Sequence, residues 1–300
     1  MKSKSQSTET HELQCLEVWG GSSHADHSAS VPGLDISVCA RPVGQSTAGG
    51  DLYLISSCSS GWISRMLLAD VAGHGDGVSD LSAKLRKAMH KSINVVDQSK
   101  LARLLNEAFS DISGGSKFAT ALLMTYFAPA DHLIIVNAGH PPPLLCRAGS
   151  QTWIPIDLDT QGVLKQSTRE LRVGIKNLPL GVIDSTQYEQ FAIKIRDGDR
   201  VCAYTDAFIE AQAPDGQLLG VAGFTDILTQ LMDTEDAANQ SDFSSQVLRA
   251  IEAGGFELAD DDHTMLTFEH NGQGTPKTNL STITKLLKNS LGLGHIDSVV

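Results

Sequence analysis

Apolar and polar residues alternate along the chain with two different periods. Over residues 34–40 every second residue is apolar, which is the period of a half-buried strand. Two longer apolar runs, 52–55 and 63–68, flank a short polar loop that contains a glycine. This arrangement predicts a β-hairpin. We therefore expect strands to open the folded part of the chain.

After residue 76 the period changes to that of a helix. Apolar residues between 78 and 93 recur three and four positions apart, and basic residues cover the opposite side. The pattern over 101–112 is clearer, because its apolar residues recur at helical spacing throughout. Asp97 or Ser99 is expected to cap this second helix, and the glycines at 114–115 to end it.

Strands return after the two helices. They are predicted at 119–127 and 133–137, followed by a hairpin from 144–147 to 152–156. Strands at 191–195 and 201–204 are expected to pair with each other across the Asp197–Gly198 turn. The remaining predictions are a short helix at 205–211, helices at 221–232 and 241–253, and a last strand at 264–268.

This order of elements is not a βαβ alternation. Two batches of strands are separated by two long helices, and more helices follow near the end. The pattern predicts an α+β sandwich of antiparallel sheets with helices outside. We expect one domain over 34–270, a flexible arm over 1–33 in which 15–19 forms a short strand, and a polar, flexible tail over 271–300.

Composition excludes several classes of protein. The chain has 23 basic and 35 acidic residues, a net charge of −12, and no basic stripe, which argues against a nucleic-acid partner. The sequence contains no run of 18 apolar residues, so we expect no membrane span. The polar N-terminus lacks the apolar segment of a secretory signal. The five cysteines are odd in number and widely spaced, so we expect reduced thiols and a cytoplasmic location. We interpret the His24–His27 pair as ordinary solvated sequence.

Four aspartates share one context, at an expected strand end or in a loop beside small residues. Asp51 opens the first hairpin strand and Asp70 closes the second, so antiparallel pairing brings both to one end of the sheet. Asp206 and Asp261 stand in similar places, and Asp262 follows directly. Each pair of carboxylates at about 4 Å costs on the order of 4 kcal/mol, so gathering them requires cations or protons. The alternative is that they are turn residues and helix caps.

All-oxygen ligands favour Mg²⁺ or Mn²⁺ over zinc. Two such ions bridged by a carboxylate activate a water and clamp phosphoryl oxygens. Six motifs of the chain point the same way. They are Gly-Gly-Asp at 49–51, Ala-Asp-Val-Ala-Gly-His-Gly at 69–75, Asn-Ala-Gly-His-Pro-Pro-Pro at 137–143, Leu-Pro-Leu-Gly at 178–181, the run from Gly198 to Ala211, and Asp-Asp-His-Thr-Met-Leu at 261–266.

In this order the motifs resemble the SpoIIE/RsbU branch of the metal-dependent (PPM) serine/threonine phosphatases, over about 34–270. The resemblance implies an αββα sandwich with two Mg²⁺ or Mn²⁺ ions. It also implies that Asp70 bridges the ions and that Asp206 and Asp261 complete the first. The Val71 carbonyl would bind the second ion, and Asp51 would reach it through water. A metal-bound water would attack phosphoserine or phosphothreonine.

Some positions depart from the family pattern or have two interpretations. Ala207 stands where the family usually has glycine, and we expect the methyl group to be tolerated. His74 is a candidate general acid, although it lies four residues after the bridging aspartate; a hydrogen-bonding role in its loop is the alternative. Asp262 is expected to orient a ligand or bind a backbone amide. His140 is expected to order its loop rather than do chemistry.

The resemblance implies a protein-serine/threonine phosphatase in bacterial signalling, with an antagonist of an anti-sigma factor as a candidate substrate. A catalytically silent interaction module and a hydrolase of small phosphoesters are the alternatives. Control is expected from a partner in trans, from the tail or from the helices at 78–112, and a homodimer is compatible with the sequence.

Overall fold

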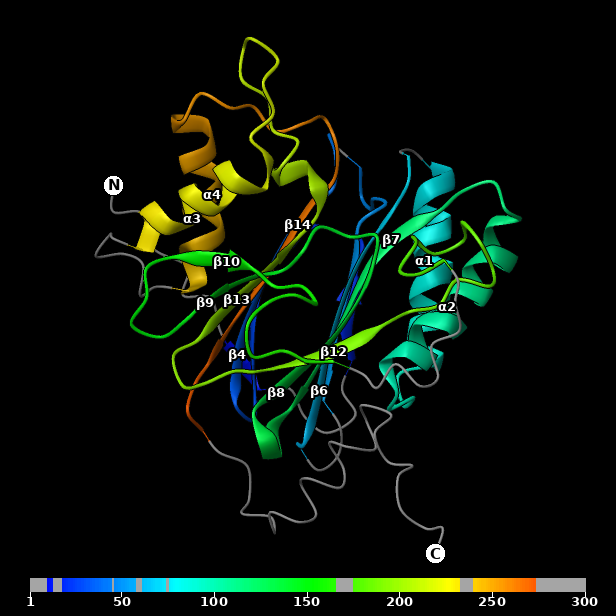
Figure 1. Cartoon of the computed structure of the whole chain (residues 1–300). Helices are drawn as coiled ribbons and strands as arrows, with labels where there is room; N and C mark the ends of the chain where they lie inside the picture. Colours follow the sequence, from blue (N-terminus) through cyan, green and yellow to red (C-terminus); the bar gives the residue numbers. More distant parts are fainter. Residues whose placement is uncertain are drawn as a thin grey trace, which may run out of the picture.

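The computed structural model describes residues 10–12, 18–44, 46–57, 61–73, 76–165, 175–232 and 240–273. Two seven-stranded sheets face each other between two pairs of helices (Figure 1). The predicted αββα sandwich is thus confirmed. None of the helices in the described ranges is long and apolar enough to cross a membrane.

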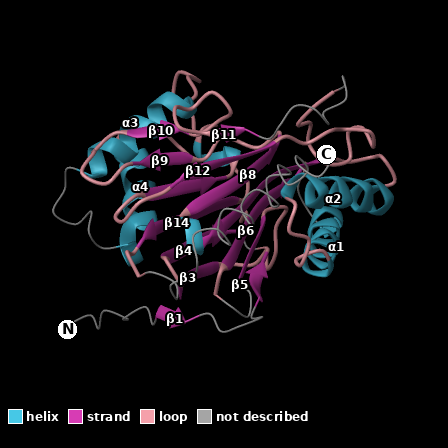
Figure 2. Cartoon of the chain, turned by 60° about the horizontal axis from the view of Figure 1, so that its bottom comes forward, coloured by secondary structure: helices cyan, strands magenta, loops and turns pink. Residues whose placement is uncertain are grey.

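Sheet I has one parallel pair, β1 with β3, and is otherwise antiparallel. In spatial order its strands are β1 (Thr10–Glu12), β3 (Ala25–Val31), β4 (Leu34–Arg41), β14 (His263–His270), β13 (Arg200–Tyr204), β9 (Leu144–Cys146) and β10 (Trp153–Pro155). Its outer face is covered by α3 (Gly220–Met232) and α4 (Gln240–Ala253) (Figure 2).

Sheet II is antiparallel throughout. In spatial order its strands are β11 (Leu164–Lys165), β12 (Gln190–Lys194), β8 (His132–Ala138), β7 (Ala119–Phe127), β6 (Ile63–Val71), β5 (Leu52–Ser57) and β2 (Val18–Gly21). Its outer face is covered by α1 (Asp76–Lys91) and α2 (Gln98–Ser113). Two short 3₁₀ turns, Ala128–Ala130 and Asp206–Phe208, follow β7 and β13.

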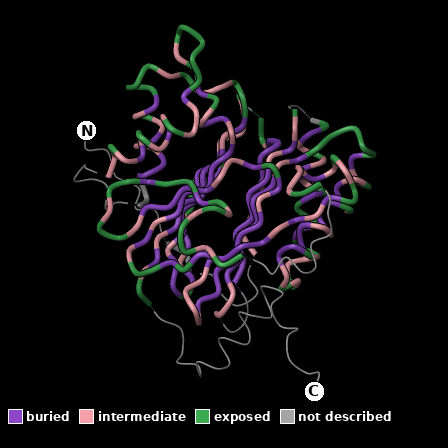
Figure 3. Tube along the Cα trace, viewed as in Figure 1, coloured by how far each residue is buried: buried purple, intermediate pink, exposed green. Residues whose placement is uncertain are grey.

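The central strands are apolar on both faces because both faces are covered. In β6, Met66 and Leu68 enter the layer between the sheets, whereas Leu67 and Ala69 pack under the helices. Figure 3 shows the resulting buried strands at the centre of the molecule. The layer between sheet I and α3 and α4 also contains the three cysteines of the described ranges, Cys39, Cys146 and Cys202, all of them buried.

The second helix begins and ends where its sequence predicts. The Asp97 side chain accepts a hydrogen bond of 2.8 Å from the Lys100 amide, and Gly114 adopts a left-handed conformation with a φ of 60°. The apolar stripe of α2, including Leu105 and Phe109, packs against sheet II. The cap and the stripe together place α2 over β7 and β8.

The flexible arm predicted for 1–33 is wrong over residues 18–31, which form β2 and β3. The strand expected at 15–19 corresponds in part to β2, and residues 13–17 lie outside the described ranges. β3 pairs with β4 through a tight turn in which Gly33 has a φ of 88°. Small residues such as Ala25 and Ala29 fill the layer between the sheets, and their low hydrophobicity hid the strand. Of the tail predicted over 271–300, the part beyond residue 273 lies outside the described residues.

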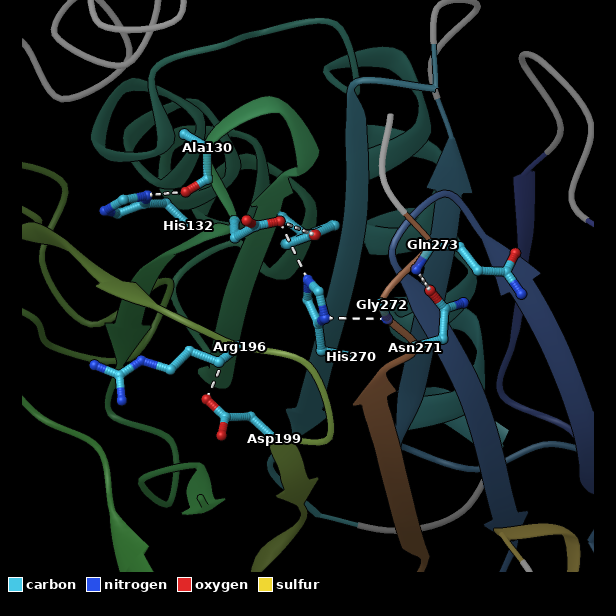
Figure 4. Close-up of polar contacts among 10 residues, drawn as sticks. Ala130, His132, Arg196, Asp199, His270, Asn271, Gly272 and Gln273 are labelled. Carbon is cyan, nitrogen blue, oxygen red and sulfur yellow. Dashed lines mark hydrogen bonds and ion pairs between the residues drawn. The ribbon is translucent and has the colours of Figure 1, made fainter. Parts of the chain in front are cut away.

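The predicted pairing of the strands on either side of Asp197 is also wrong. β12 pairs with β8 in sheet II, whereas β13 pairs with β9 and β14 in sheet I. The turn therefore crosses from one sheet to the other. The buried Asp199 carboxylate stabilises this crossing. It accepts a hydrogen bond from the Arg196 amide (Figure 4). It also accepts one from the Ala148 amide and pairs with Arg147 at 2.6 Å.

Candidate metal centre

The predicted aspartates come to one end of the sandwich from two sheets. Asp51 precedes β5, and Asp70 is the penultimate residue of the neighbouring β6; the register places Leu52 opposite Ala69. Asp206 follows β13, and Asp261 stands just before the antiparallel β14. Because the two sheets face each other, these two strand pairs end at the same place.

Thr205 connects the sheets at this end. Its hydroxyl donates a hydrogen bond of 2.9 Å to Asp51 Oδ2 and accepts one of 2.9 Å from the Thr264 amide. Its own amide donates to the Thr264 carbonyl. All three residues are buried, so this short network fixes the position of Asp51 in sheet II relative to β13 and β14 in sheet I.

Asp262 makes a second connection. Its Oδ1 accepts from the Val43 amide at 2.7 Å, and its Oδ2 accepts from the Gly50 amide at 2.5 Å. Its own amide donates to Asp261 Oδ1 at 2.8 Å. Asp262 therefore binds backbone amides, which was one of the two roles expected of it, and it holds the chain that leads into Asp51.

The glycines before Asp51 are required by close packing. A Cβ on Gly49 would lie 2.2 Å from Asp262 Oδ2, and one on Gly50 would lie 2.9 Å from the Val71 carbonyl oxygen. In the structure they allow the approach of the Asp262 carboxylate and of the chain beside Asp70.

The carboxylates at this end raise one another's pKa. Burial, and then the charge of Asp70, raise the pKa of Asp51 well above its ordinary range. Burial, followed by the charges of Asp206 and Asp261, raises the pKa of Asp70 to about 7. The pKa values of Asp206 and Glu210 are raised as well, again by burial first and by neighbouring acids second. Negative charge at this end is therefore poorly compensated.

The donors fit hard divalent cations in their chemistry, since carboxylate and carbonyl oxygens are the ligands that Mg²⁺ and Mn²⁺ prefer. The carboxylates, however, are not tightly clustered. Within the described ranges, no three Asp, Glu, His or Cys side chains lie close enough together to form a ready-made metal site. Mutual repulsion of carboxylates favours such spacing, and binding of a cation would draw them together.

Two residues of this end were not predicted from the sequence. Glu210 stands four residues after Asp206, and its charge contributes to the raised pKa of Asp70. The Lys117 ammonium lies against the loop that follows Asp70, since a Cβ on Gly73 would lie 2.5 Å from Lys117 Nζ. The sequence position of Lys117, just before the strand β7 that pairs with β6, could have predicted that it lies near Asp70. His74 lies outside the described residues, so both of its proposed roles stay predictions.

A model of the family described as Stage II sporulation protein E (SpoIIE) matches residues 63–271. The chain belongs to the SpoIIE family. Phosphoserine phosphatase RsbP of Bacillus subtilis (strain 168) is 22% identical over 193 residues, which cover 59% of this chain and 43% of RsbP. The chain thus corresponds to less than half the length of that relative.

Solved structures of SpoIIE-type proteins share the fold. The structure of the RsbU and RsbW domains of Rv1364c from Mycobacterium tuberculosis has a TM-score of 0.63 at 22% identity, covering 88% of this chain and 70% of that one. RsbX in complex with magnesium has a TM-score of 0.56 at 13% identity, covering 81% and 98%. The sandwich described above is thus the PPM phosphatase fold.

Proposed function

We propose that this chain is a metal-dependent phosphatase that hydrolyses phosphoserine or phosphothreonine in a protein substrate. The observation that supports this most strongly is the convergence of mutually repelling carboxylates from two sheets in a SpoIIE-family fold, with Asp51 buried and Asp70 and Asp206 partly buried. Raised pKa values of this kind gather at functional sites, because a purely structural acid is normally paired with a donor.

In this proposal Asp70, Asp206, Asp261, the Val71 carbonyl and, through water, Asp51 are the groups that would hold two Mn²⁺ or Mg²⁺ ions. Asp70 would serve both ions, Asp206 and Asp261 the first, and the Val71 carbonyl and Asp51 the second. When bound, such ions supply an activated water and neutralise phosphoryl charge.

The residues around these ligands keep them in place and admit the substrate. Thr205 orients Asp51 through its hydroxyl, and Asp262 holds the backbone of Gly50. Lys117 places a positive charge beside the loop after Asp70. A chain with a net charge of −12 repels an anionic phosphoester, so a local cation favours its approach.

The substrate class that we propose is a phosphorylated bacterial signalling protein, and an antagonist of an anti-sigma factor is the specific candidate. Support comes from RsbP, named as a phosphoserine phosphatase, and from the structure that joins RsbU and RsbW domains. We also propose that a regulatory partner acts in trans.

The direct test is hydrolysis of p-nitrophenyl phosphate and of a phosphoserine peptide by the metal-stripped chain, with Mn²⁺ or Mg²⁺ added back. We expect metal-dependent activity that Asp70→Asn lowers by about a thousandfold or more, since a lost ligand removes several kcal/mol of charge stabilisation. The control Asp226→Asn, exposed on α3, should retain full activity.

Full activity in Asp70→Asn would refute the mechanism. Manganese binding without hydrolysis of either substrate would instead identify a silent interaction module. Hydrolysis of p-nitrophenyl phosphate but of no phosphopeptide or phosphoprotein would identify a hydrolase of small phosphoesters.

A further inference from the structure

His140 lies in a connection from sheet II to sheet I. It follows β8 and precedes β9, and Asn137 holds its backbone on both sides: Asn137 Oδ1 accepts from the His140 amide, and Asn137 Nδ2 donates to the His140 carbonyl, both at 2.8 Å. Gly139 turns the chain with a φ of 69°. The loop is therefore ordered by Asn137, and the imidazole ring is available for other contacts.

One ring nitrogen reaches the strand beside Asp70. His140 Nδ1 lies 2.8 Å from Thr120 Oγ1. Thr120, on β7, is the register partner of Asp70 on β6, so this hydrogen bond ends directly next to the proposed bridging ligand. The ring thus contacts sheet II at the level of the metal centre.

The other ring nitrogen is directed at sheet I. His140 Nε2 is buried. Burial lowers the pKa of the ring, and the nearby Tyr204 backbone acts in the opposite direction by raising it. Nε2 nevertheless completes no hydrogen bond within the described part of the chain. Tyr204 ends β13, two residues before Asp206. A buried polar nitrogen without a partner is uncommon, and it is typical of sites that change on binding.

Burial also keeps the ring neutral, because it lowers the pKa of His140 to about 3. A neutral imidazole carries one N–H. When the Thr120 hydroxyl donates to Nδ1, this N–H is on Nε2 and points to the Tyr204 backbone. The ring then acts as a donor toward one sheet and an acceptor toward the other.

We propose that His140 is a positioning residue that sets the separation of Asp70 and Asp206, by hydrogen bonding Thr120 on sheet II and closing onto the Tyr204 carbonyl on sheet I when the centre binds metal. This inference rests on the proposed metal centre and assigns His140 a role beyond ordering its own loop. Its contacts support it, since both ring nitrogens face strands outside the loop.

The test is the affinity of the metal-stripped full chain for Mn²⁺, measured by isothermal titration calorimetry well below the melting temperature. His140→Asn keeps an acceptor near Thr120 but cannot reach Tyr204, and we expect its dissociation constant to rise about tenfold, at the low end for outer residues of metal sites. Thr120→Val should weaken binding similarly. The double variant should be no weaker than the weaker single variant, because both residues belong to one chain of contacts.

His132→Asn is the matched control. His132 is also on sheet II and partly buried, but its Nδ1 contacts the Ala130 carbonyl at 2.6 Å at the opposite end of the sandwich (Figure 4). Each of the three variants, His140→Asn, Thr120→Val and His132→Asn, can lower the melting temperature by a loss of stability. Only the changes at His140 and Thr120 should also lower the affinity for manganese.

Unchanged manganese affinity in both His140→Asn and Thr120→Val would overturn the positioning role while leaving the proposed phosphatase intact. Wild-type protein that binds no manganese would overturn the metal centre and the positioning role together. Wild-type protein that binds manganese but hydrolyses no phosphoester would contradict the proposed function alone, and a weaker His140→Asn would still support the inference.

Discussion

Strand β13 is flanked by two aspartates, the buried Asp199 before it and the partly buried Asp206 after it, and the surroundings of the two differ. Asp199, just before the strand, accepts hydrogen bonds from two backbone amides and pairs with Arg147. Asp206, just after it, has the amides of its own turn and several acidic neighbours. β14 repeats the contrast over roughly 25 Å: His270 at its end contacts Asp131, whereas Asp261 before its start adds its negative charge to those around Asp70 and Asp206.

At the Asp199 end, carboxylates have matched donors. Asp131 Oδ1 accepts from the Tyr126 hydroxyl at 3.0 Å and lies 3.1 Å from His270 Nε2. At the Asp70 end, the acids raise one another's pKa, and the network of Thr205 and Asp262 orders them without neutralising them. The difference teaches that the first set stabilises the fold by itself, whereas the second set is left with uncompensated negative charge among the described residues, which is the condition that the proposed metal centre needs.

The largest expected effect comes from removing an acid at the Asp70 end. We expect Asp206→Asn to lower metal-dependent hydrolysis by about a thousandfold or more, because the several kcal/mol supplied by a metal ligand are lost. The same change should leave the melting temperature of the metal-free protein equal or higher, since one of several repelling charges disappears. Steady-state kinetics and thermal unfolding check the two halves, and activity within tenfold of wild type would contradict the comparison.

The matching change at the other end should do the opposite. Asp199→Ala leaves two amides and the Arg147 guanidinium without their acceptor, so we expect a loss of about 3 kcal/mol in the free energy of unfolding. Manganese affinity should stay unchanged. Urea unfolding measures the loss, with the exposed Asp215→Ala as a control expected within about 0.5 kcal/mol of wild type. Equal stability of both variants would remove the distinction between the ends.

A backbone position sharpens the comparison further. Gly49→Ala would place a Cβ against the Asp262 carboxylate, and we expect it to destabilise the protein by about 1–3 kcal/mol and to weaken manganese binding. Gly77→Ala, in α1, where the added Cβ would meet no described atom within 4 Å apart from its own helix backbone, should instead be neutral or stabilising by up to about 1 kcal/mol. Similar behaviour of the two variants in urea unfolding would count against close packing at Gly49.

Taken per pH unit, the smallest effect is the dependence of stability on pH. The pKa of Asp70 is raised from 3.8 to about 7, so between these values the folded state binds more protons than the unfolded state. The metal-free protein should therefore lose stability as the pH rises from about 4 to about 7, by at most about 1.4 kcal/mol per pH unit for this group. Saturating Mn²⁺ should abolish the fall. Stability that rises over this window would contradict a raised pKa of Asp70.

Local signals in the sequence predicted much of the fold. The Asp97 cap, the Gly114 stop and the alternation of 34–40 each depend on neighbours in the chain, and each element formed where expected. The gathering of the aspartates was also predictable, because Asp51 and Asp70 belong to one hairpin whose register follows from its apolar pattern.

The remainder depends on contacts distant in sequence. The Asp197–Gly198 turn locally favours a hairpin, yet β12 pairs with β8 in one sheet and β13 pairs with β9 in the other. The Ala148 amide, which is distant in sequence, binds Asp199 beside this turn. The contact of Lys117 with Gly73 and that of His140 with Thr120 arise from the packing of separate segments. The pattern of apolar and polar residues within one segment cannot predict such contacts between segments.

The burial of Cys39, Cys146 and Cys202 beneath α3 and α4 has a practical consequence. Their pKa values are raised by burial, so each thiol resists alkylation as long as the helices stay docked. These sulfurs form an intrinsic chemical reporter on one outer layer of the molecule. Mass spectrometry after brief exposure to iodoacetamide would reveal how often that layer detaches, without any label introduced into the chain.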